Sequence, residues 1–255
     1  MDYYSIEELD KTGLVKTLMT SEGRGCWFSN DPQGHGNYRA VASDFGISAE
    51  RDMVGTFQRH SGTVMAVTRE NAGQNVLWRA PEPEAWDGIV TNEPGLMLTS
   101  MESDCVPVFL LDPVRKTIGM VHSGWRGAVK DISVTAVRLM ASEYGSRPED
   151  ILAAFGPCIC SRCYEVSDDL IEEFSSLYSE QELRRIFAPK AGGKYLLNMN
   201  RAIRIRLEGA GVKPENIFDA EYCTYHQNIF YSHRRQVRDS LPTTDNMLTA
   251  IMLLP

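Results

Sequence analysis

The chain has 255 residues, 43% of them hydrophobic and 24% charged, so it can bury a full core, and we expect one domain over residues 1–255. Its formal net charge of -8 argues against nonspecific nucleic-acid binding, and no run approaches the roughly 20 apolar residues of a membrane helix. Six cysteines are too few for a disulfide scaffold, and residues 1–10 are acidic and polar, unlike a signal peptide. We therefore expect a soluble cytoplasmic protein with mostly free thiols, in which local arginines could still bind a small anion.

Short segments rich in Val, Ile, Thr and Met, separated by Gly, Pro and Asp, predict strands in the first half of the chain. In chain order these segments are GTVMAVT at 62–68, GLMLTSMES at 95–103, VPVFLLDP at 106–113 and KTIGMVHS at 116–123. We expect the last two to be adjacent strands joined by a turn near Asp112 to Lys116. The short stretch RAPEPEAW at 79–86 is interpreted as a loop within the domain.

Helical spacing of apolar residues begins at Gly127 and ends near Gly145. Strand-like ILAAF follows at 151–155, and helices are expected after Ser167, a plausible N-cap, and over 198–208. NIFYSH at 228–233 and MLTAIMLL at 247–254 predict strands near the end of the chain. Together the elements indicate a mixed α/β (α+β) fold with a central mixed β-sheet flanked by helices.

One thiol and two imidazoles form the first candidate site. Cys105 precedes one predicted strand, His122 lies near the end of the next, and His60 precedes another strand by a few residues. These ligand types suit zinc, and three protein ligands with an open fourth position are typical of a catalytic site. The spacings of 45 and 17 residues match no compact zinc finger, so by pattern alone a small buried cysteine and two ordinary histidines are the favoured interpretation.

Other clusters are weaker. CICSRC brings Cys158, Cys160 and Cys163 together, but no second cluster completes a four-ligand site, so incidental thiols are the favoured interpretation. YSHRRQ brings His233, Arg234 and Arg235 together, which predicts a phosphate site or, equally well, a solvated basic edge of a strand. Gly-rich phosphate loops and a GxSxG turn are absent, which argues against nucleotide triphosphate hydrolysis, Rossmann-type redox chemistry and a serine hydrolase.

Four ordered segments carry a resemblance to a known family. TSMESDCVPVFLLD, GMVHSGWRGAVKDI, FGPCICSRCYEV and EYCTYHQNIFYSHRR resemble the successive signatures of the YfiH-like family. This family is also called the laccase-domain or multicopper polyphenol oxidase family, and now purine nucleoside phosphorylase. FQRHSGTV resembles the family's QVHG segment, so the resemblance implies that His60, Cys105 and His122 are the metal ligands and catalytic residues.

The departures from the family pattern lie mainly before residue 56, where the chain is divergent and shortened. CWFSNDPQGHGNYRAVASDFG keeps Phe28 and Ser29 of the family's FSTRxGG loop but lacks its arginine and most of its length. NYR suggests that Arg39 replaces the arginine of the following helix, displaced by one position. In the QVHG segment, Arg59 and Ser61 replace valine and glycine. A shortened loop beside the pocket would change substrate choice.

The resemblance implies a cytosolic, zinc-dependent purine nucleoside phosphorylase acting on adenosine, inosine or S-methyl-5'-thioadenosine, with adenosine deaminase activity as well. Phosphate would be held by arginines such as Arg39, Arg126 or Arg235, while Asp87 and Asp104 would orient a ligand histidine or a ribose hydroxyl. The partners implied are a purine nucleoside and phosphate, with no nucleic acid and no membrane, and the chain would be a monomer or homodimer.

Three alternatives stay open at this point. Cys105 as a thiolate nucleophile with His122 as base would make a peptidoglycan-precursor editing hydrolase. A copper-binding polyphenol oxidase is disfavoured, since five histidines supply few ligands for several coppers. A noncatalytic binding protein on the same scaffold is motivated by the altered N-terminal loop.

Overall fold

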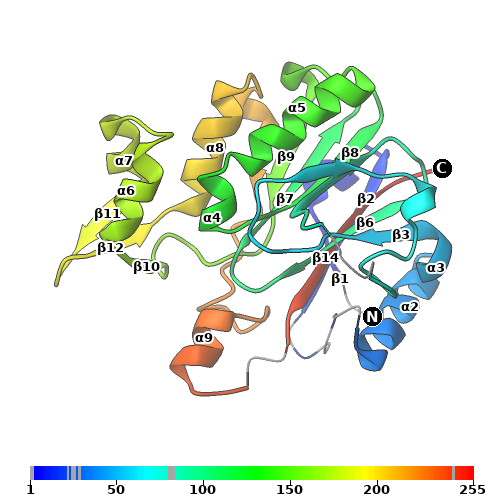
Figure 1. Ribbon diagram of the computed structural model, residues 1–255, viewed down its shortest axis with the longest axis horizontal. Helices are drawn as coiled ribbons and strands as arrows, with labels where there is room; N and C mark the ends of the chain where they lie inside the picture. Colours follow the sequence, from blue (N-terminus) through cyan, green and yellow to red (C-terminus); the bar gives the residue numbers. More distant parts are fainter. Residues whose placement is uncertain (1–2, 22, 24–26, 28–29, 80–83, 243–244) are drawn as a thin grey trace.

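The computed structural model describes residues 3–21, 23, 27, 30–79, 84–242 and 245–255. Phe28, Ser29 and part of the 79–86 stretch lie outside the described residues. Two mixed sheets, stacked face to face, carry the fold, and helices cover the outer face of each (Figure 1). The mixed α/β architecture is therefore confirmed, with two large sheets and a small one where a single central sheet was expected.

The first large sheet has the strand order β1-β2-β14-β6-β3, and the second has the order β13-β9-β7-β8-β5-β4. The strands of the first are β1 (Tyr3–Tyr4), β2 (Val15–Thr20), β14 (Met247–Leu253), β6 (Met97–Glu102) and β3 (Met53–Gly55). The strands of the second are β13 (Ile217–Asp219), β9 (Leu152–Phe155), β7 (Val106–Asp112), β8 (Thr117–Ser123), β5 (Gly88–Thr91) and β4 (Val64–Ala66).

Alternation along the strands divides the core into three layers. In β7, Phe109 and Leu111 point into the layer between the sheets, while Val108 and Leu110 point to the helices on the other side. A strand with period two presents successive side chains to opposite faces, so a strand covered on both faces is apolar throughout. This explains why β7, β8 and β14 are buried along their whole length.

Helices complete the outer layers. On the second sheet lie α4 (Trp125–Ala128), α5 (Ile132–Tyr144) and α8 (Met199–Gly209), and on the first sheet lie α2 (Pro32–Asp44) and α3 (Ala49–Asp52). The short helix α1 (Glu7–Asp10) instead packs Leu9 into the layer between the sheets. As expected, the helical stretch ends near Gly145, which is the C-cap of α5 and whose φ of 70° is a conformation that glycine adopts without steric cost. The predicted start at Gly127 was wrong, because Gly127 lies in α4 and α5 begins at Ile132. No helix among the described residues is long and apolar enough to cross a membrane.

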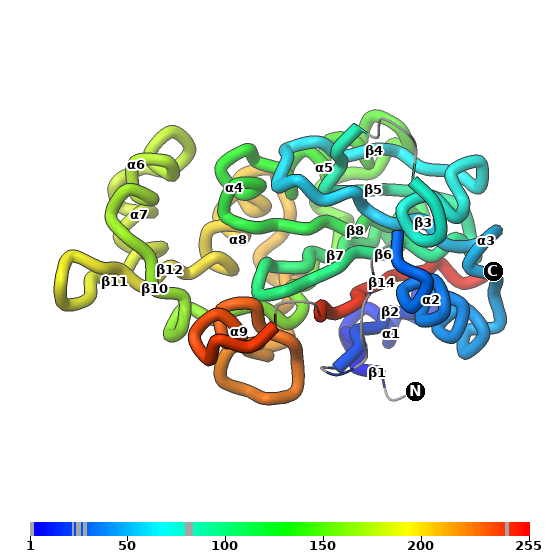
Figure 2. The backbone as a smooth tube through the Cα atoms, turned by 60° about the horizontal axis from the view of Figure 1, so that its bottom comes forward, coloured from blue at the N-terminus to red at the C-terminus, as the bar shows by residue number. Residues whose placement is uncertain are grey.

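A small unit projects from one end of the molecule (Figure 2). It contains a three-stranded sheet in the order β10-β12-β11. Its elements are β10 (Glu165–Ser167), α6 (Asp169–Ser175), α7 (Glu180–Ile186), β11 (Phe187–Lys190) and β12 (Lys194–Leu197). Ser167 ends β10, and Asp168 is the N-cap of α6, so the predicted cap was wrong by one residue.

The predicted strand at 228–233 was also wrong. Residues 228–232 lie in no strand, and α9 (His233–Arg238) begins there, with the Ser232 side chain accepting a hydrogen bond from the backbone N of Arg235. Phe230 is buried by edge-to-face contacts with Tyr4 and Tyr222, at ring-centroid distances of 4.9 and 5.4 Å. Aromatic packing therefore accounts for the apolar pattern that suggested a strand.

The hairpin of β7 and β8 positions the site. Asp112 Oδ1 accepts hydrogen bonds from the backbone N of Val114 and Arg115 at 2.8 and 3.0 Å, which forms the expected turn. From this turn the antiparallel register runs to the pair Pro107 and His122. The residue before β7 is Cys105, so the register brings it to the end of β8 where His122 lies.

Candidate active site

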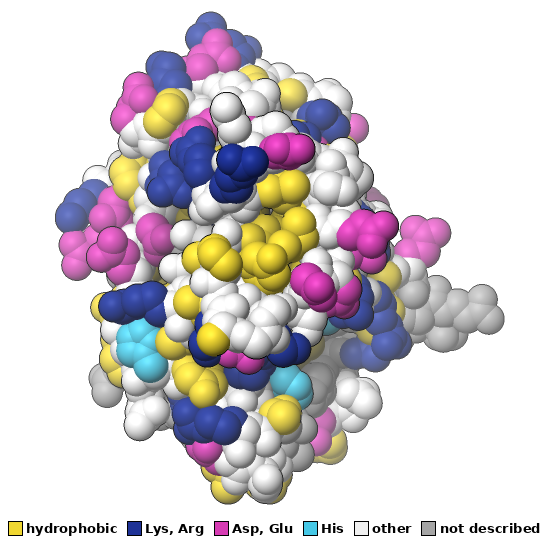
Figure 3. All heavy atoms as spheres, turned by 90° about the vertical axis from the view of Figure 1, so that its left-hand side faces the viewer, with side chains coloured by type: hydrophobic (Ala, Val, Ile, Leu, Met, Phe, Trp, Pro, Cys, Tyr) yellow, Lys and Arg dark blue, Asp and Glu magenta, His cyan; other side chains and the backbone are white. Residues whose placement is uncertain are grey.

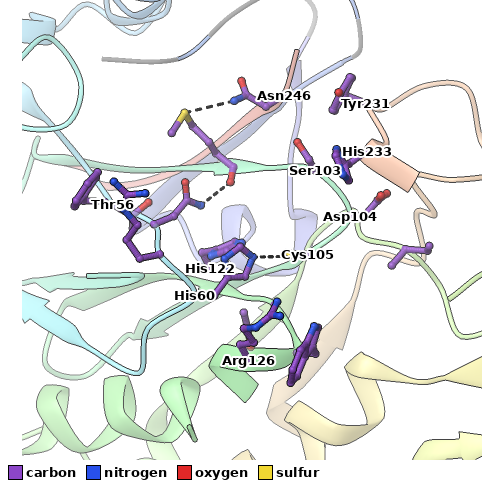
Figure 4. Close-up of a pocket in the computed structure, with 18 of the residues that line it drawn as sticks. Thr56, His60, Ser103, Asp104, Cys105, His122, Arg126, Tyr231, His233 and Asn246 are labelled. Carbon is purple, nitrogen blue, oxygen red and sulfur yellow. Dashed lines mark hydrogen bonds between the residues drawn. The ribbon is translucent and has the colours of Figure 1, made fainter. Parts of the chain in front are cut away.

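Three side chains from separate parts of the chain converge at the end of the hairpin. The possible ligand atoms of His60, Cys105 and His122 all lie within 4.8 Å of one another. Cys105 Sγ is 3.9 Å from His60 Nε2, and the two imidazole rings meet at a centroid distance of 4.9 Å (Figure 4). His60 lies in the loop between β3 and β4, with a φ of 55°. The predicted trio is therefore brought together in space.

Asp87, just before β5, holds two of these residues in place. Its Oδ1 accepts hydrogen bonds from the backbone N of His60 at 2.9 Å and from His122 Nδ1 at 2.8 Å. Its Oδ2 accepts from the backbone N of Arg59 at 3.1 Å and from the backbone N and Oγ of Ser61 at 2.7 and 2.6 Å. Because Asp87 takes Nδ1 of His122, the Nε2 atom of that ring is the one that faces the other donors.

The charges in the site favour ligand binding. Burial opposes ionisation of Asp87, but hydrogen bonds from His122 and Ser61 outweigh it and hold its pKa at about 2. Burial also lowers the pKa of His122, yet the neighbouring Glu102 and Cys105, together with the hydrogen bond to Asp87, raise that pKa well above its ordinary value. Burial lowers the pKa of His60, and the neighbouring His122 lowers it further. A metal ion at Nε2 of His122 would replace a proton that the site already attracts.

Glu102 is a buried carboxyl group that sequence reasoning missed. Its Oε1 accepts a hydrogen bond from Ser100 Oγ at 2.7 Å, and its Oε2, which has no hydrogen-bond partner among the described residues, lies 3.9 Å from His122 Nε2. Burial raises its pKa to about 7. The signal in the sequence is a glutamate at the end of a predicted strand, three residues before Cys105.

Gly124 has no side chain because the trio occupies the space. A Cβ atom at this position would lie 2.8 Å from His60 Cδ2 and 2.9 Å from Cys105 Sγ. Its backbone is extended, so this close approach, and not an unusual φ, requires glycine. The glycine of the SGWRG segment is thus part of the site.

The trio opens into a cavity of about 900 Å³, within the range of small-molecule sites. Among the labelled residues, Arg126 lies on one side of the trio and Ser103, His233 and Asn246 lie on the other (Figure 4). Cationic and aromatic side chains share the lining, which includes Arg59, Arg79, Arg126 and Arg234 together with Phe57, Trp125 and Tyr164. This combination suits an anionic ligand with a flat ring.

Asp104 lines the cavity and joins its wall to the hairpin. Its φ is 82°, and its carboxylate accepts hydrogen bonds from Thr224 Oγ1 and, at 2.7 Å, from the backbone N of Arg234. Its carbonyl accepts from the backbone N of Ile159 at 3.0 Å. Asp104 therefore links the Cys105 segment to two distant parts of the chain. Asp87 is fully buried, and it holds His122 and His60 in place by hydrogen bonds.

Two of the expected phosphate-binding arginines lie outside the cavity. Arg126 lines it, with its guanidinium 4.3 Å from the Trp125 ring centroid. Arg39 lies on α2, where its Nε pairs with Glu50 Oε1 at 2.7 Å, and it is not among the cavity-lining residues. Arg235 is buried and donates to the carbonyls of Thr224 and Phe230. Its neighbour Arg234 lines the cavity instead.

The cysteines of CICSRC divide into two kinds. Cys158 is buried, and its Sγ donates to Asn200 Oδ1 at 3.3 Å. Cys160 and Cys163 approach Cys223 and His226, with all four possible ligand atoms within 4.8 Å of one another. The expectation that no second cluster completes a four-ligand site was therefore wrong, because the completing residues lie some 60 positions further along the chain.

Comparisons with known proteins extend these observations. A family model described as multi-copper polyphenol oxidoreductase laccase matches residues 29–254. The crystal structure of the Bacillus licheniformis hypothetical protein YfiH superposes with a TM-score of 0.87 at 28% identity, covering 98% of this chain and 96% of that one.

Three curated relatives carry names of activities. Purine nucleoside phosphorylase YlmD of Bacillus subtilis (strain 168) is 35% identical over 179 residues, which are 70% of this chain and 64% of the relative. Purine nucleoside phosphorylase LACC1 of Mus musculus is 33% identical over 210 residues, which are 80% of this chain and 44% of the relative. Adenosine deaminase RL5 of an unknown prokaryotic organism is 30% identical over 196 residues, which are 76% of this chain and 74% of the relative. The matched part thus spans less than two thirds of YlmD and less than half of LACC1.

Proposed function

The chain belongs to the multi-copper polyphenol oxidoreductase laccase family, and from this premise we propose that it is a zinc-dependent purine nucleoside phosphorylase. Its substrates would be phosphate and a nucleoside such as adenosine, inosine or S-methyl-5'-thioadenosine. The observation that carries the proposal is the convergence of His60, Cys105 and His122 in a cavity lined by cationic and aromatic side chains. The names of the YlmD and LACC1 relatives support the same activity.

The donor set fits zinc. With Zn–S near 2.3 Å and Zn–N near 2.0 Å, sulfur and nitrogen ligands of a tetrahedral ion lie about 3.5 Å apart. The distance of 3.9 Å between Cys105 Sγ and His60 Nε2 is close to that separation. Asp87 orients the His122 ring, as a hydrogen-bonded carboxylate does for many zinc-binding histidines. Zinc bound by these three residues would supply a Lewis acid with a fourth position open to a ligand.

Copper is the less favoured ion. The name of the family refers to several copper ions, whose centres need many histidines. Of the five histidines in this chain, two belong to the trio and a third, His226, belongs to the second cluster. A single thiolate with two imidazoles is the ligand set that the cavity offers.

Two of the cavity-lining arginines, Arg126 and Arg234, are the proposed phosphate ligands. Arg126 follows the β8 strand that carries His122, and its guanidinium stacks on Trp125. Arg234 stacks 5.2 Å from the Tyr164 ring centroid and donates from Nη1 to the carbonyl of Glu165 at 2.9 Å. A stacked guanidinium keeps its N–H donors in one plane, which suits forked hydrogen bonds to phosphate oxygens.

The proposed reaction exchanges one bond at the anomeric carbon of the ribose. The bond from this carbon to the purine nitrogen breaks, and a phosphate oxygen forms a new bond to it. The departing purine keeps the electron pair and gains the proton that hydrogen phosphate loses, so the products are the free base and ribose 1-phosphate. Positive charge develops on the ribose at the transition state, and phosphate positioned by Arg126 and Arg234 would stabilise it.

Adenosine deamination is a second candidate, favoured by the relative named adenosine deaminase RL5. In this reaction, water replaces the amino group at the purine C6, and ammonia and inosine are the products. The buried Glu102, with its Oε2 3.9 Å from His122 Nε2, would place a carboxyl group beside the trio. Inorganic phosphate is a substrate of phosphorolysis only, so its omission separates the two reactions.

A matched pair of arginine variants tests the proposed phosphate site. Arg126→Gln removes a charged donor from the cavity, whereas Arg39→Gln removes an exposed guanidinium outside it. A hydrogen bond to a charged group is worth about 1.5–3 kcal/mol, so we expect the Arg126 variant to raise the KM for phosphate by roughly 10- to 100-fold. The Arg39 variant should match the parent. Equal phosphate KM values for all three proteins, measured with zinc-loaded chain and inosine, would contradict this assignment.

A further inference from the structure

Two short turns of the same length meet outside the active site. One runs from Cys160 to Cys163, between β9 and β10, and the other runs from Cys223 to His226, between β13 and α9. Each turn presents two potential ligands separated by two residues. His226 Nδ1 lies 3.8 Å from Cys160 Sγ and 3.3 Å from Cys163 Sγ. The four donors thus form one cluster of three sulfurs and one nitrogen.

The sheet itself brings the two turns together. β9 and β13 are parallel neighbours, with Phe155 opposite Asp219, and parallel strands leave a sheet at the same edge. The pairing resumes beyond the strands as a bridge between Cys158 and Cys223. Two backbone hydrogen bonds hold this bridge, from Cys158 N to the Tyr222 carbonyl at 3.2 Å and from Thr224 N to the Cys158 carbonyl at 3.0 Å.

Backbone amides then shape each turn around the sulfurs. The Cys160 amide donates to Cys223 Sγ at 3.4 Å, so one turn supports the sulfur of the other. Within the first turn, the Cys163 amide donates to the Cys160 carbonyl at 2.9 Å. Within the second, the Cys223 amide donates to Gln227 Oε1 at 2.7 Å. Hydrogen bonds of backbone amides therefore shape both turns without a bound ion.

We propose that Cys160, Cys163, Cys223 and His226 form a structural zinc site. Three thiolates and one imidazole, arranged as C-x2-C and C-x2-H, are a common ligand set of closed tetrahedral zinc. Such an ion would separate its sulfur and nitrogen ligands by about 3.5 Å, and the two distances of 3.8 and 3.3 Å lie on either side of that value. Four protein ligands leave no open position, in contrast to the three-ligand cluster in the cavity.

The ion would stabilise one wall of the cavity. Ile159 and Tyr164 line the cavity from either side of the first turn, and Arg234 follows the second. Two existing contacts already connect these segments to the site: Thr224 Oγ1 donates to Asp104, and Arg234 Nη1 donates to the carbonyl of Glu165. A zinc ion at the turns would cross-link the two turn segments, which the Arg234 to Glu165 contact already joins, and so limit the movement of Tyr164 and Arg234.

The cluster also lies within reach of solvent, as entry of a metal ion requires. His226 is exposed, Cys160 and Cys163 are half-buried, and Cys223 is 2% exposed. On the face that carries α6, α7 and the small sheet, histidine and basic side chains reach the surface below a hydrophobic patch (Figure 3). This site does not depend on the proposed nucleoside chemistry, since it uses none of the residues assigned to it.

Zinc content of matched variants tests the proposal. Each protein is purified under reducing conditions and dialysed first against zinc and then against metal-free buffer. The parent should then retain two zinc ions per chain, and the double variant Cys105→Ser and His60→Ala should retain one. Cys163→Ser should also lose one ion, whereas Cys158→Ser, a change at a neighbouring buried cysteine outside the cluster, should lose none. A folded Cys105 and His60 double variant that retains no zinc would overturn the proposal.

Substitution by cobalt identifies the ligands directly. In the Cys105 and His60 double variant, bound cobalt should show thiolate-to-cobalt charge-transfer absorption with intense visible bands of tetrahedral geometry. His226→Cys in this background should keep these bands and strengthen the charge-transfer absorption, whereas His226→Ala should weaken cobalt affinity at least tenfold. His226 is exposed, so neither change threatens the core. Octahedral spectra, or a Cys160 to Cys163 disulfide in the intact mass of the freshly purified parent, would refute the site.

Discussion

Replacing Asp87 by asparagine removes one charge from the site at nearly constant volume. The carboxylate accepts hydrogen bonds through both oxygens, whereas an asparagine side chain accepts through one oxygen and donates through its amide nitrogen. If the nitrogen takes the Oδ1 place, it faces the N–H of His60 and Nδ1 of His122. If it takes the Oδ2 place, it faces the backbone N–H of Arg59 and Ser61. In either orientation two donors oppose each other at a buried position.

The expected loss of stability has two parts. The pKa of Asp87 is about 2, against an ordinary value of 3.8, and this shift corresponds to about 2.5 kcal/mol at neutral pH. A buried N–H group left without an acceptor costs a further 1–3 kcal/mol or so. We therefore expect the free energy of unfolding of the metal-free protein to fall by about 4 kcal/mol. Urea unfolding followed by tryptophan fluorescence measures this difference.

The same substitution should weaken metal binding. With its amide nitrogen in the Oδ1 place, asparagine could not accept a hydrogen bond from His122 Nδ1. The ring would then carry its proton on Nε2, the nitrogen that faces His60 and Cys105. Loss of a carboxylate that orients a zinc-binding histidine typically costs 10- to 100-fold in affinity. Competition with a chelator of known affinity, in a background without the Cys163 thiol, isolates this site from the second cluster.

Asp112→Asn is the matched control, because Asp112 is an equally buried carboxylate at the far end of the same hairpin. Its Oδ1 accepts both backbone hydrogen bonds of the turn, and asparagine can keep that oxygen in place. We expect a smaller loss of stability and unchanged zinc affinity. If Asp87→Asn also left zinc affinity and stability unchanged while the protein stayed folded, the assigned role of Asp87 would be refuted.

Three further predictions concern the surroundings of the trio. Burial raises the folded pKa of Glu102 from 4.5 to about 7, so the metal-free protein is most stable below pH 4.5 and loses stability as pH rises through 7. Glu102→Gln should therefore raise the free energy of unfolding by up to about 3 kcal/mol at pH 8 and by little at pH 4. Equal effects at the two pH values would argue against the shift. Gly124→Ala would push a Cβ atom against His60 and Cys105 and should weaken zinc binding tenfold or more. Gly36→Ala, whose Cβ atom would have no neighbour within 4 Å, should leave zinc binding unchanged. Calorimetric titration with zinc distinguishes the two variants. Zinc at the trio should protect Cys105 from alkylation, and rapid alkylation of the zinc-loaded protein would favour the alternative in which this thiolate is a free nucleophile.

The hairpin is the part of the fold and the site that the sequence predicts best. Two apolar strand segments joined by a turn near Asp112 to Lys116 leave few ways to pair, and the antiparallel register then places Cys105 beside His122. His60 is different, because 45 residues separate it from Cys105. Its residue type made it a candidate ligand beside the other two, but no spacing supported the group, and the resemblance to a family made the trio the favoured interpretation.

The remaining features depend on contacts between distant segments. Glu102 ends the buried strand β6, and its importance follows from its distance to His122, which no local pattern contains. Cys223 and His226 share the spacing of Cys160 and Cys163, so the repeated two-residue gap was the available signal, but only the pairing of β9 with β13 shows that the turns meet. The assignment of residues 1–255 to one domain stays a prediction.

The arginines show a related limit. A guanidinium is recognisable in sequence as a possible phosphate ligand, but its role depends on what else it contacts. The exposed side chain of Arg39 on α2 pairs with Glu50, and Arg235 donates its hydrogen bonds to main-chain carbonyls. Arg234, one residue before Arg235, lines the cavity. Helical geometry in α9 turns adjacent residues about 100° apart, which separates these two roles.

Formation of ribose 1-phosphate from inosine and phosphate tests the central claim most directly. Phosphorus NMR detects the sugar phosphate, and chromatography of the same sample measures free hypoxanthine. For zinc-loaded protein we predict equal amounts of both products, none without phosphate, and none from a folded Cys105→Ala variant that retains the second metal site. Hypoxanthine released without phosphate, or no product from the zinc-loaded parent, would contradict the claim that this cavity carries out nucleoside phosphorolysis.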